Sequence, residues 1–408
     1  MQNKKRKIDS VSGPPVPLIN KRSKSTSRFK YYEDVTFIFT TKQTSTNTKN
    51  VVDLLRRKIW EGNKQPRLAF GWGCNANGQL GVGNRDVHDK PEQLKIPDHS
   101  RLSKIASGNT FTVFLTCDGR LYSCGWGPGS SKFSYFKKLS IVNGLPYIRS
   151  VVAGRTHIVA LSEAGDVYFW RKGIDDIPVR LSDVPNTLYV SCGQNTSFTI
   201  NESGHVHVWG NNSSGQLGLG DLVERVTPIR NNYLHDIIKI EGGDAHTIAL
   251  SRNGTLYSFG SNTNGQLGVY DYRGSQSPTP ILVDKIPNGI RITDINCGDY
   301  SCVVLTSDGN VYSWGKNADG QLSGRPSDDQ NTPKIVRMPE KKRVLSISSG
   351  YKHTLAMMED GSVWSWGQSR IGQLGRDEGN KSWEITELKD RGVMAVFADA
   401  YLSFALCK

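Results

Sequence analysis

Short apolar segments separated by tight-turn dipeptides recur along most of the chain. Two such segments within residues 247–259 flank Asn-Gly at 253–254, and similar segments flank Asp-Gly at 308–309 and 360–361. These dipeptides favour a β-hairpin when β-forming segments flank them, because their residues tolerate positive φ. The pattern predicts a series of antiparallel strand pairs over residues 66–408.

A repeat with fixed internal offsets underlies this pattern. Each copy begins with a Gly-x-x-His-like element, has a second glycine eleven residues later, and completes an aromatic-Gly pair seventeen residues after its start. The six copies begin at Gly108, Gly154, Gly193, Gly243, Gly298 and Gly350. One copy has Trp170-Arg171 in place of aromatic-Gly. Gly-Gln-Leu-Gly or a near match follows five aromatic-Gly pairs at one spacing, starting at Gly78, Gly215, Gly265, Gly320 and Gly372.

The two ends of this repeat series complement each other. Gly-Trp-Gly at 71–73 has no Gly-x-x-His-like partner before it, whereas the segment 398–406 resembles such a partner and lacks a hairpin turn of its own. The first strand therefore completes the last repeat, which closes a ring without open sheet edges. Seven units of about 49 residues suit four-stranded propeller blades. The predicted fold class is all-β: a seven-bladed β-propeller over residues 66–408, closed by an N-terminal strand that completes the last blade.

These motifs resemble those of the regulator of chromosome condensation repeat family. The resemblance rests on Gly-x-x-His-Thr at 243–247, Tyr-x-Trp-Gly at 312–315, Tyr-x-Phe-Gly at 257–260 and Asn-Gly-Gln-Leu-Gly at 77–81. It covers essentially all of residues 66–408 and implies the same seven-bladed propeller. Because a propeller is a scaffold that hosts many functions, the resemblance specifies the fold more than the role.

Basic residues concentrate at the N-terminus. The chain has a net charge of +13, and residues 1–30 contain nine lysines and arginines against one acidic residue. This segment is also rich in Ser, Pro and Asn, a composition that predicts a disordered tail. Its basic residues form two clusters at the spacing of a two-part nuclear import signal. The clusters comprise Lys4, Lys5, Arg6, Lys7, Lys21, Arg22 and Lys24.

An import receptor is the partner that these two clusters favour, and the expected localisation is nuclear. A weak contact of the tail with DNA phosphates is a second interpretation, and a solvated tail without a partner is a third. No apolar run approaches the roughly 18 residues that a membrane span needs, so no membrane partner is expected. The N-terminal segment also lacks the apolar stretch of a secretory signal.

Residues 31–65 form a junction between the tail and the propeller. Residues 31–40 alternate as in a strand, and 51–60 have apolar positions spaced as in a helix. We expect a short helix that packs on the propeller; a partner-binding helix is the alternative.

Histidines and tryptophans recur at fixed repeat positions, which indicates structural roles. His157, His246 and His353 share one position, and each imidazole is expected to form hydrogen bonds within its own blade. Other copies fill that position with Phe111, Thr196, Ser301 and Tyr401. A metal or acid–base role would instead require the side chains to converge on one site. The blade core is expected to contain Trp72, Trp209, Trp314 and Trp366.

Seven cysteines, none in a Cys-x-x-Cys pair, indicate reduced thiols. Cys192 and Cys297 precede the repeat glycine, at a position that mostly has small residues in other copies, so we expect them to pack there. The Gly-Gln-Leu-Gly turns lack the Lys-Ser/Thr of a phosphate-binding loop. The sequence therefore predicts no catalytic residues, no metal ligands and no cofactor, and indicates a protein that is not an enzyme.

The two residues after each repeat glycine lie, in the family that the chain resembles, on loops at one face of the propeller. Members that catalyse nucleotide exchange on the Ran GTPase have Asp, Asp and His at three of these positions. The match gives Arg155, Asn195 and Tyr300 at those positions in this chain. Those members also insert a wedge after the third aromatic-Gly pair, whereas Gly193 here follows Arg171 by only 22 residues. Both departures argue against exchange activity.

We therefore expect a non-catalytic nuclear scaffold that binds other proteins and associates with chromatin. The alternative is a guanine nucleotide exchange factor for a Ran-like small GTPase, which the whole-fold resemblance and the basic tail favour. The expected partner is a nuclear protein, either a small GTPase or a chromatin component. Exposed aromatic side chains beside charges are typical of interface anchors. The expected partner-binding face comprises Arg155, Asn195, Asp244, Asp299, Tyr300, Tyr351, Lys352 and Asp399.

Overall fold

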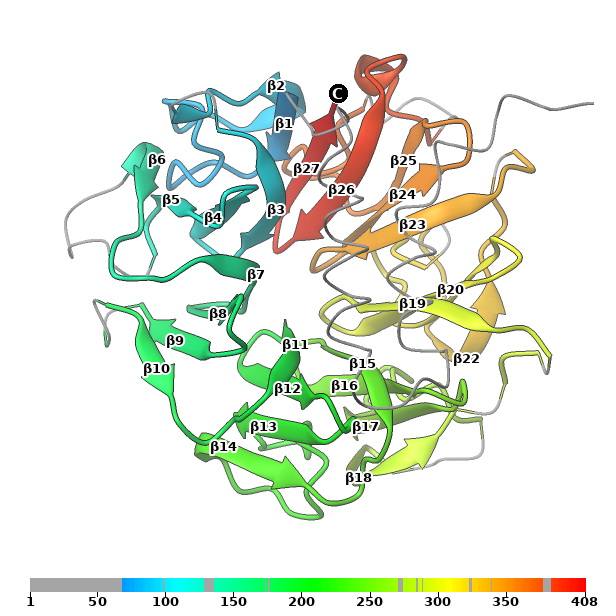
Figure 1. Cartoon of the computed structure of the whole chain (residues 1–408). Helices are drawn as coiled ribbons and strands as arrows, with labels where there is room; N and C mark the ends of the chain where they lie inside the picture. The colour runs from blue at the N-terminus through cyan, green and yellow to red at the C-terminus, as the bar shows by residue number, and fades with distance from the viewer. Residues whose placement is uncertain are drawn as a thin grey trace, which may run out of the picture.

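Seven antiparallel sheets surround a central axis, so the predicted seven-bladed β-propeller is confirmed (Figure 1). The computed structural model describes residues 68–408 apart from 98–99, 128–135, 173, 175–176, 271–273, 284, 288, 323–324, 339 and 377–382. The predicted tail over 1–30 and the junction over 31–65 lie outside the described residues. The strands β3, β7, β11, β15, β19, β23 and β26 are innermost in their blades (Figure 1).

The blades follow one another along the chain, and each is named here by its strands. The first three are β3 (Leu102–Ser107), β4 (Phe111–Thr116), β5 (Leu121–Gly125) and β6 (Phe136–Ile141); β7 (Ile148–Ala153), β8 (His157–Ser162), β9 (Val167–Arg171) and β10 (Val179–Leu181); and β11 (Thr187–Cys192), β12 (Thr196–Asn201), β13 (Val206–Gly210) and β14 (Arg225–Asn231).

The next three blades repeat this order. They are β15 (Ile237–Gly242), β16 (His246–Ser251), β17 (Leu256–Ser261) and β18 (Gln276–Leu282); β19 (Ile292–Cys297), β20 (Ser301–Thr306), β21 (Val311–Gly315) and β22 (Gln330–Ile335); and β23 (Val344–Ser349), β24 (His353–Met358) and β25 (Val363–Gly367). The last of these blades has no fourth strand among the described residues; instead, Glu384 forms a single antiparallel bridge with Trp364 of β25. A short 3-10 helix, η2 (Thr386–Leu388), follows.

The seventh, closing blade combines the two ends of the propeller. It contains β26 (Val393–Asp399), β27 (Leu402–Cys407), β1 (Leu68–Gly73) and β2 (His88–Gln93), with β1 and β27 side by side (Figure 1). The antiparallel register runs from Leu68 opposite Cys407 to Gly73 opposite Leu402. The prediction that the first strand completes the last blade is confirmed.

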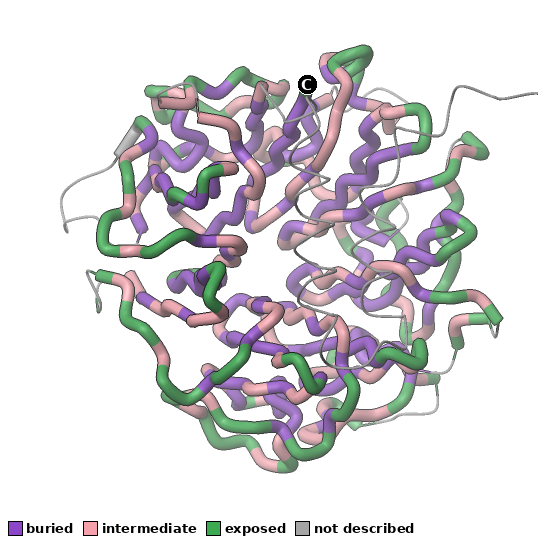
Figure 2. The backbone as a smooth tube through the Cα atoms, viewed as in Figure 1, coloured by how far each residue is buried: buried purple, intermediate pink, exposed green. Residues whose placement is uncertain are grey.

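The hydrophobic core lies between neighbouring blades. Figure 2 shows buried segments along the strands of each blade and exposed segments towards the outer rim. Phe198 of β12 packs with Ile240 of β15 and Phe259 of β17, all three fully buried. Phe114 of β4 meets Phe404 of β27 edge-on, with ring centroids 5.9 Å apart. Since each blade buries its faces against two neighbours, the core depends on the ring being closed.

Three of the four predicted core tryptophans also form hydrogen bonds to the neighbouring blade. Trp72, Trp209, Trp314 and Trp366 are all buried, as predicted. The indole Nε1 of Trp314 donates to the carbonyl of Gln266 at 2.9 Å, and Gln266 belongs to the Gly-Gln-Leu-Gly loop of the preceding blade. Trp366 and Trp72 make the equivalent bonds at 3.1 Å to Gln321 and Gln373. These loops therefore supply carbonyl acceptors that hold the next blade.

The three repeat histidines are buried, but the prediction that each forms hydrogen bonds within its own blade is wrong. The Nε2 atoms of His157 and His353 lie 2.9 and 2.8 Å from the hydroxyls of Ser197 and Ser403, in the following blades. His246 Nε2 lies 3.2 Å from Cys302 Sγ in the same way. The sequence pattern is local to one blade, whereas the imidazole extends into the next. Burial lowers the pKa of both His157 and His353 to about 4.

The last turn of the ring is displaced by one residue from the predicted alignment. Gly73 pairs with Leu402 just as Gly260 pairs with His246, so Leu402, not Tyr401, fills the repeat histidine position. Asp399 accordingly takes the place of the repeat glycine, and Ala400 turns the chain at a φ of 48°. Because this copy has no glycine to mark the turn, its apolar residues alone could not define the alignment.

Candidate partner-binding face

Each innermost strand connects to the second strand of its blade through a tight two-residue turn. In the turn after β15, the N–H of Gly243 donates to the carbonyl of His246 at 2.8 Å. A Cβ on Gly243 would lie 2.2 Å from His246 Cε1 and 2.6 Å from the Gly298 carbonyl oxygen. The Gly-x-x-His element therefore needs glycine because the imidazole and the next blade both press against its Cα.

These turns form a hydrogen-bonded ring around the axis. The N–H of the first turn residue donates to a carbonyl in the next blade's turn at 2.7–3.1 Å. Six bonds of this kind occur among the described residues: Asn109 to Arg155, Arg155 to Gln194, Gln194 to Gly243, Asp244 to Asp299, Asp299 to Tyr351, and Tyr351 to Ala400. The seventh junction has a bond from the Ser107 N–H to Asp399 Oδ2 instead, at 3.1 Å. The turns are thus tied to one another as well as to their own blades.

The structure brings the eight predicted face residues to this one end of the propeller. The first position of a turn is held by Arg155, Asp244, Asp299 and Tyr351, and the second by Asn195, Tyr300 and Lys352. Asp399 occupies the glycine position of the closing blade and lines the central cavity. We call this end of the propeller, formed by the seven turns, the turn face.

Several of these side chains contact one another on the turn face. The Tyr300 hydroxyl donates to Asp244 Oδ2 at 3.1 Å, and the Lys316 ammonium lies 5.2 Å from the centre of the Tyr300 ring. Lys352 Nζ lies 3.3 Å from Asp319 Oδ2. Arg155 is exposed to solvent. The face therefore presents both signs of charge around partly exposed aromatic rings.

The sequence reasoning missed a third set of residues on the turn face. The residue after each aromatic-Gly pair donates its N–H to the carbonyl of the second turn residue, as Lys316 does to Tyr300 at 2.9 Å. Lys172, which follows Trp170-Arg171, makes the same bond to Thr156 at 2.8 Å. The Lys172 ammonium lies 3.3 Å from the centre of the Trp126 ring and donates to Thr110 Oγ1 at 3.1 Å. The fixed spacing after aromatic-Gly was the available signal for this set.

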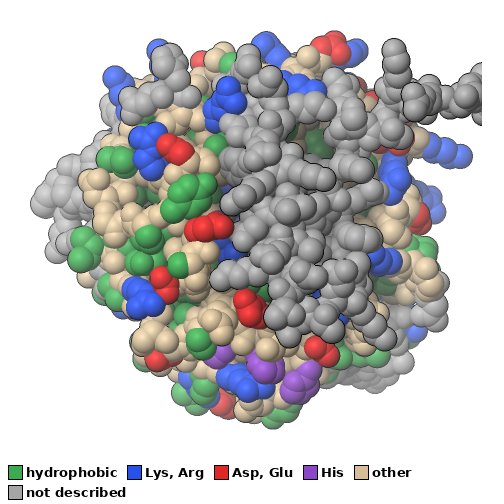
Figure 3. All heavy atoms as spheres, viewed as in Figure 1, with side chains coloured by type: hydrophobic (Ala, Val, Ile, Leu, Met, Phe, Trp, Pro, Cys, Tyr) green, Lys and Arg blue, Asp and Glu red, His purple; other side chains and the backbone are tan. Residues whose placement is uncertain are grey.

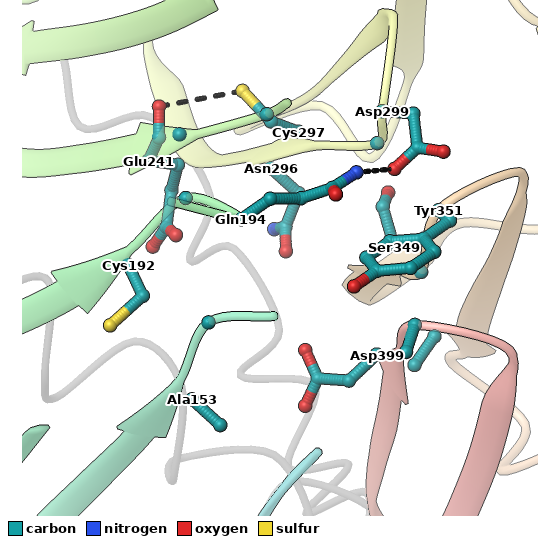
Figure 4. Close-up of a pocket in the computed structure, with 18 of the residues that line it drawn as sticks. Ala153, Cys192, Gln194, Glu241, Asn296, Cys297, Asp299, Ser349, Tyr351 and Asp399 are labelled. Atoms are coloured by element: carbon teal, nitrogen blue, oxygen red, sulfur yellow. Dashed lines mark hydrogen bonds between the residues drawn. The ribbon is translucent and has the colours of Figure 1, made fainter. Parts of the chain in front are cut away.

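A polar cavity of about 100 Å³ lies on the axis beneath the turns. Figure 4 shows Asp299, Tyr351 and Asp399 around it, with the Gln194 amide donating to the Asp299 carboxylate. Burial raises the pKa of Asp299 to about 7, and the nearby Asp244 carboxylate adds to the rise. Burial likewise raises the pKa of Asp399 to about 7. A polar space of this size suits a few water molecules.

Glu241 of β15 anchors a second polar group on the cavity wall. Its carboxylate accepts hydrogen bonds from the Tyr189 hydroxyl at 2.5 Å and the Ser191 hydroxyl at 2.8 Å. Lys239 pairs with Asp294 and lies 3.6 Å from Glu241. Burial raises the pKa of Tyr189, so its hydroxyl stays a donor. These bonds satisfy the carboxylate and indicate a structural role for it.

The charge on the visible surface is mixed rather than of one sign. Figure 3 shows Lys and Arg interspersed with Asp and Glu over the described part of this view. A large basic surface, which nucleic-acid binding by the propeller would favour, is not seen there. No helix among the described residues has both the length and the apolar character that crossing a membrane requires.

Comparison with known proteins shows the same repeat. The model of the regulator of chromosome condensation (RCC1) repeat matches residues 68–115, 203–250, 253–305 and 308–357. A second model of this repeat matches 189–216, 237–266, 292–321 and 344–373.

Similar proteins with this repeat differ in their functions. The ultraviolet-B receptor UVR8 of Arabidopsis thaliana is 30% identical over 340 residues, which are 76% of this chain and 75% of the receptor. The human E3 ubiquitin-protein ligase HERC2 is 28% identical over 330 residues, but these span only 7% of that protein.

The solved structure of yeast RCC1 (Prp20) bound to Kap60 has a TM-score of 0.75 at 20% identity. The alignment covers 84% of this chain and 90% of that one, so the two share a fold. The repeat matches and the ring of seven blades lead to one conclusion: the chain belongs to the regulator of chromosome condensation (RCC1) repeat family.

Proposed function

We propose that this protein is a non-catalytic nuclear scaffold whose turn face binds a chromatin component. The observation that carries the proposal is the hydrogen-bonded ring of turns, which fixes the backbone beneath Arg155, Tyr300 and Lys352. Side chains on a fixed backbone lose little conformational freedom on binding, and Tyr and Arg are frequent interface anchors. Yeast Prp20, which shares the fold, has been described for its binding to Gsp1p and histones.

The basic tail supports the nuclear part of the proposal. Its two basic clusters, at residues 4–7 and 21–24, are complementary in charge to the acidic surface that an import receptor offers to extended basic segments. Yeast Prp20 was solved in complex with Kap60. The tail would deliver the chain to the nucleus, and the turn face would then bind its partner there.

Nucleosome binding by the full chain tests the scaffold. We expect binding to reconstituted nucleosomes that Arg155→Glu weakens at least about tenfold, because truncating or reversing an anchoring arginine typically costs more than 1.4 kcal/mol. Lys334→Glu, on the outer strand β22, is the matched control and is expected to bind as the wild type does. Replacement of the tail lysines and arginines by alanine separates a DNA contact from the contact of the face.

Two results would overturn the scaffold proposal. One is the absence of binding to nucleosomes and to free histones by the folded chain. The other is equal weakening by Arg155→Glu and Lys334→Glu, which would mean that the turn face is not the contact surface.

Nucleotide exchange on a Ran-like GTPase is the second candidate, and the fold shared with yeast RCC1 favours it. Arg155, Asn195 and Tyr300 do not reproduce the acidic and imidazole groups of exchange-active members. Residues 172–186, between β9 and β11, contain only the short strand β10 in their described part. GDP release from Ran, followed with a fluorescent nucleotide, decides between the two: we expect no acceleration, and a strong acceleration would favour the exchange factor.

A further inference from the structure

The three buried histidines occupy the same repeat position, but the side chain that each one faces in the following blade differs. His157 faces Ser197, His246 faces Cys302, and His353 faces Ser403. Each of these facing residues lies directly opposite the last or next-to-last residue of the innermost strand in its own blade. The opposite residues are Cys192, Cys297 and Ala398. Among the described residues, only the second site combines an imidazole with two thiols.

The ligand atoms of the three side chains at this second site lie close to one another. The ligand atoms of His246, Cys297 and Cys302 all lie within 4.8 Å of one another, and His246 Nε2 is 3.2 Å from Cys302 Sγ. A tetrahedral zinc site with Zn–S near 2.3 Å and Zn–N near 2.0 Å has ligand separations of about 3.5–3.8 Å. Small side-chain shifts would bring the three atoms to these separations.

We propose that His246, Cys297 and Cys302 bind one zinc ion between the β15–β18 and β19–β22 blades. Thiolate and imidazole ligands together suit zinc better than the hard cations magnesium and calcium. In the structure, Cys302 Sγ donates to the Gln266 carbonyl and Cys297 Sγ to the Glu241 carbonyl, each at 3.4 Å. Binding releases both thiol protons, since zinc coordinates the thiolate, and a water or an added ligand completes the fourth position.

The surroundings support a held ion rather than a surface contact. Cys302 and His246 are at most 1% exposed, and all three residues lie on or at the ends of paired strands. Cys297 also lines the central cavity, on the wall shown in Figure 4. The bound ion would link two neighbouring blades.

Cobalt titration of the reduced, metal-free full chain tests the site. We expect one Co²⁺ per chain, with thiolate-to-cobalt charge-transfer absorption and visible bands of a tetrahedral ion, which one equivalent of Zn²⁺ abolishes. Cys302→Ser recreates the native pair of His157 with Ser197, and Cys297→Ala recreates the native Ala398, so both variants should fold. Each is expected to weaken Co²⁺ binding by more than the roughly 10–100-fold that loss of an outer-shell partner costs.

Matched controls come from the other members of the series. Cys192→Ala, opposite Ser197, is expected to leave Co²⁺ binding unchanged. His246→Phe, which places the residue of Phe111 at this position, is expected to abolish the tetrahedral spectrum, whereas His353→Phe is expected to preserve it.

Three outcomes would overturn the zinc proposal. The first is a reduced chain that gives no thiolate-to-cobalt absorption. The second is absorption that persists in Cys297→Ala and Cys302→Ser. The third is an isolated chain in which Cys297 and Cys302, which face each other across β19 and β20, form a disulfide. Its mass would be lower by two hydrogens, and neither thiol would react with an alkylating agent.

Discussion

The carboxylate of Asp399 accepts a hydrogen bond from the backbone N–H of Ser107 at 3.1 Å. This side chain bridges the closing blade and the β3–β6 blade, whereas six other junctions among the described turns are bridged by backbone carbonyls. A glycine at the same position in other copies could not make the bond. The residue that interrupts the repeat thus joins the last blade to the first.

The acceptor at position 399 should therefore matter more than its charge. We expect Asp399→Asn to be more stable than Asp399→Ala by about 1–3 kcal/mol, because alanine leaves the Ser107 N–H without its partner. Urea unfolding of both variants at one pH measures this difference. Equal midpoints and slopes for the two variants would show that the bond contributes nothing.

Asp299 and Asp399 should give the propeller a measurable pH dependence. Each has a pKa of about 7 in the folded chain against about 4 when unfolded, so each binds a proton on folding between these values. Their contribution to the free energy of unfolding therefore falls as pH rises from about 4 to 7, by at most about 1.4 kcal/mol per pH unit and group. The buried His157 and His353, with lowered pKa values, act in the opposite direction below about pH 6.5.

The variant Asp299→Asn separates these opposing effects. An amide can still accept the bond from Gln194 but does not titrate, so its stability relative to the wild type is expected to rise between pH 5 and 8. Thermal or urea unfolding across this range measures the difference. A difference that stays constant with pH would contradict the raised pKa of Asp299.

Two glycines should differ sharply in their tolerance of alanine. At Gly254 the backbone has φ of 90° but a Cβ meets nothing within 4 Å, so Gly254→Ala is expected to cost about 1–2 kcal/mol of backbone strain. At Gly243 a Cβ would overlap the His246 ring and the Gly298 carbonyl, and Gly243→Ala is expected to cost about 3 kcal/mol or more. Unfolding free energies of the two variants measure the difference. A cost for Gly243→Ala no larger than that for Gly254→Ala would show that the turn at Gly243 relaxes around the added Cβ.

The nuclear proposal predicts that both basic clusters of the tail are needed for import. Alanine at Lys4, Lys5, Arg6 and Lys7, or at Lys21, Arg22 and Lys24, is expected to shift a fluorescently tagged chain from the nucleus to the cytoplasm. Microscopy of both variants beside the wild type measures the shift. Exchange of the same lysines for arginine preserves the charge and is expected to preserve the distribution. Unchanged localisation of the alanine variants would contradict the import signal.

The sequence predicted the ring because the repeat marks its own boundaries. Fixed offsets from glycine to glycine specify hairpins, and the unmatched Gly-Trp-Gly at 71–73 specified how the ring closes. The prediction slipped at Asp399, where the glycine marker is missing. It also assigned the bonds of His246 to the wrong blade, because contacts between blades leave no regular spacing in the chain.

The candidate site was predicted in part. The repeat positions brought Arg155, Asp299 and Tyr351 to one face, since every turn has the same place in its blade. Lys172 and Trp126 belong to different blades, and their contact depends on the directions of the two side chains. The spacing of the repeat in the sequence does not predict these directions. The same limit applies to His246 and the two cysteines, which meet only when neighbouring blades pack.

The pairing of β1 with β27 sets an order of events during translation. The ribosome adds about 5–20 residues per second, so β27 emerges on the order of 20–70 s after β1. Through that interval one edge of β1 lacks its native partner while blade after blade is made. The nascent chain must therefore keep an early strand available for a late one, and chaperones that shield exposed strand edges are expected to bind this protein before they bind its finished form.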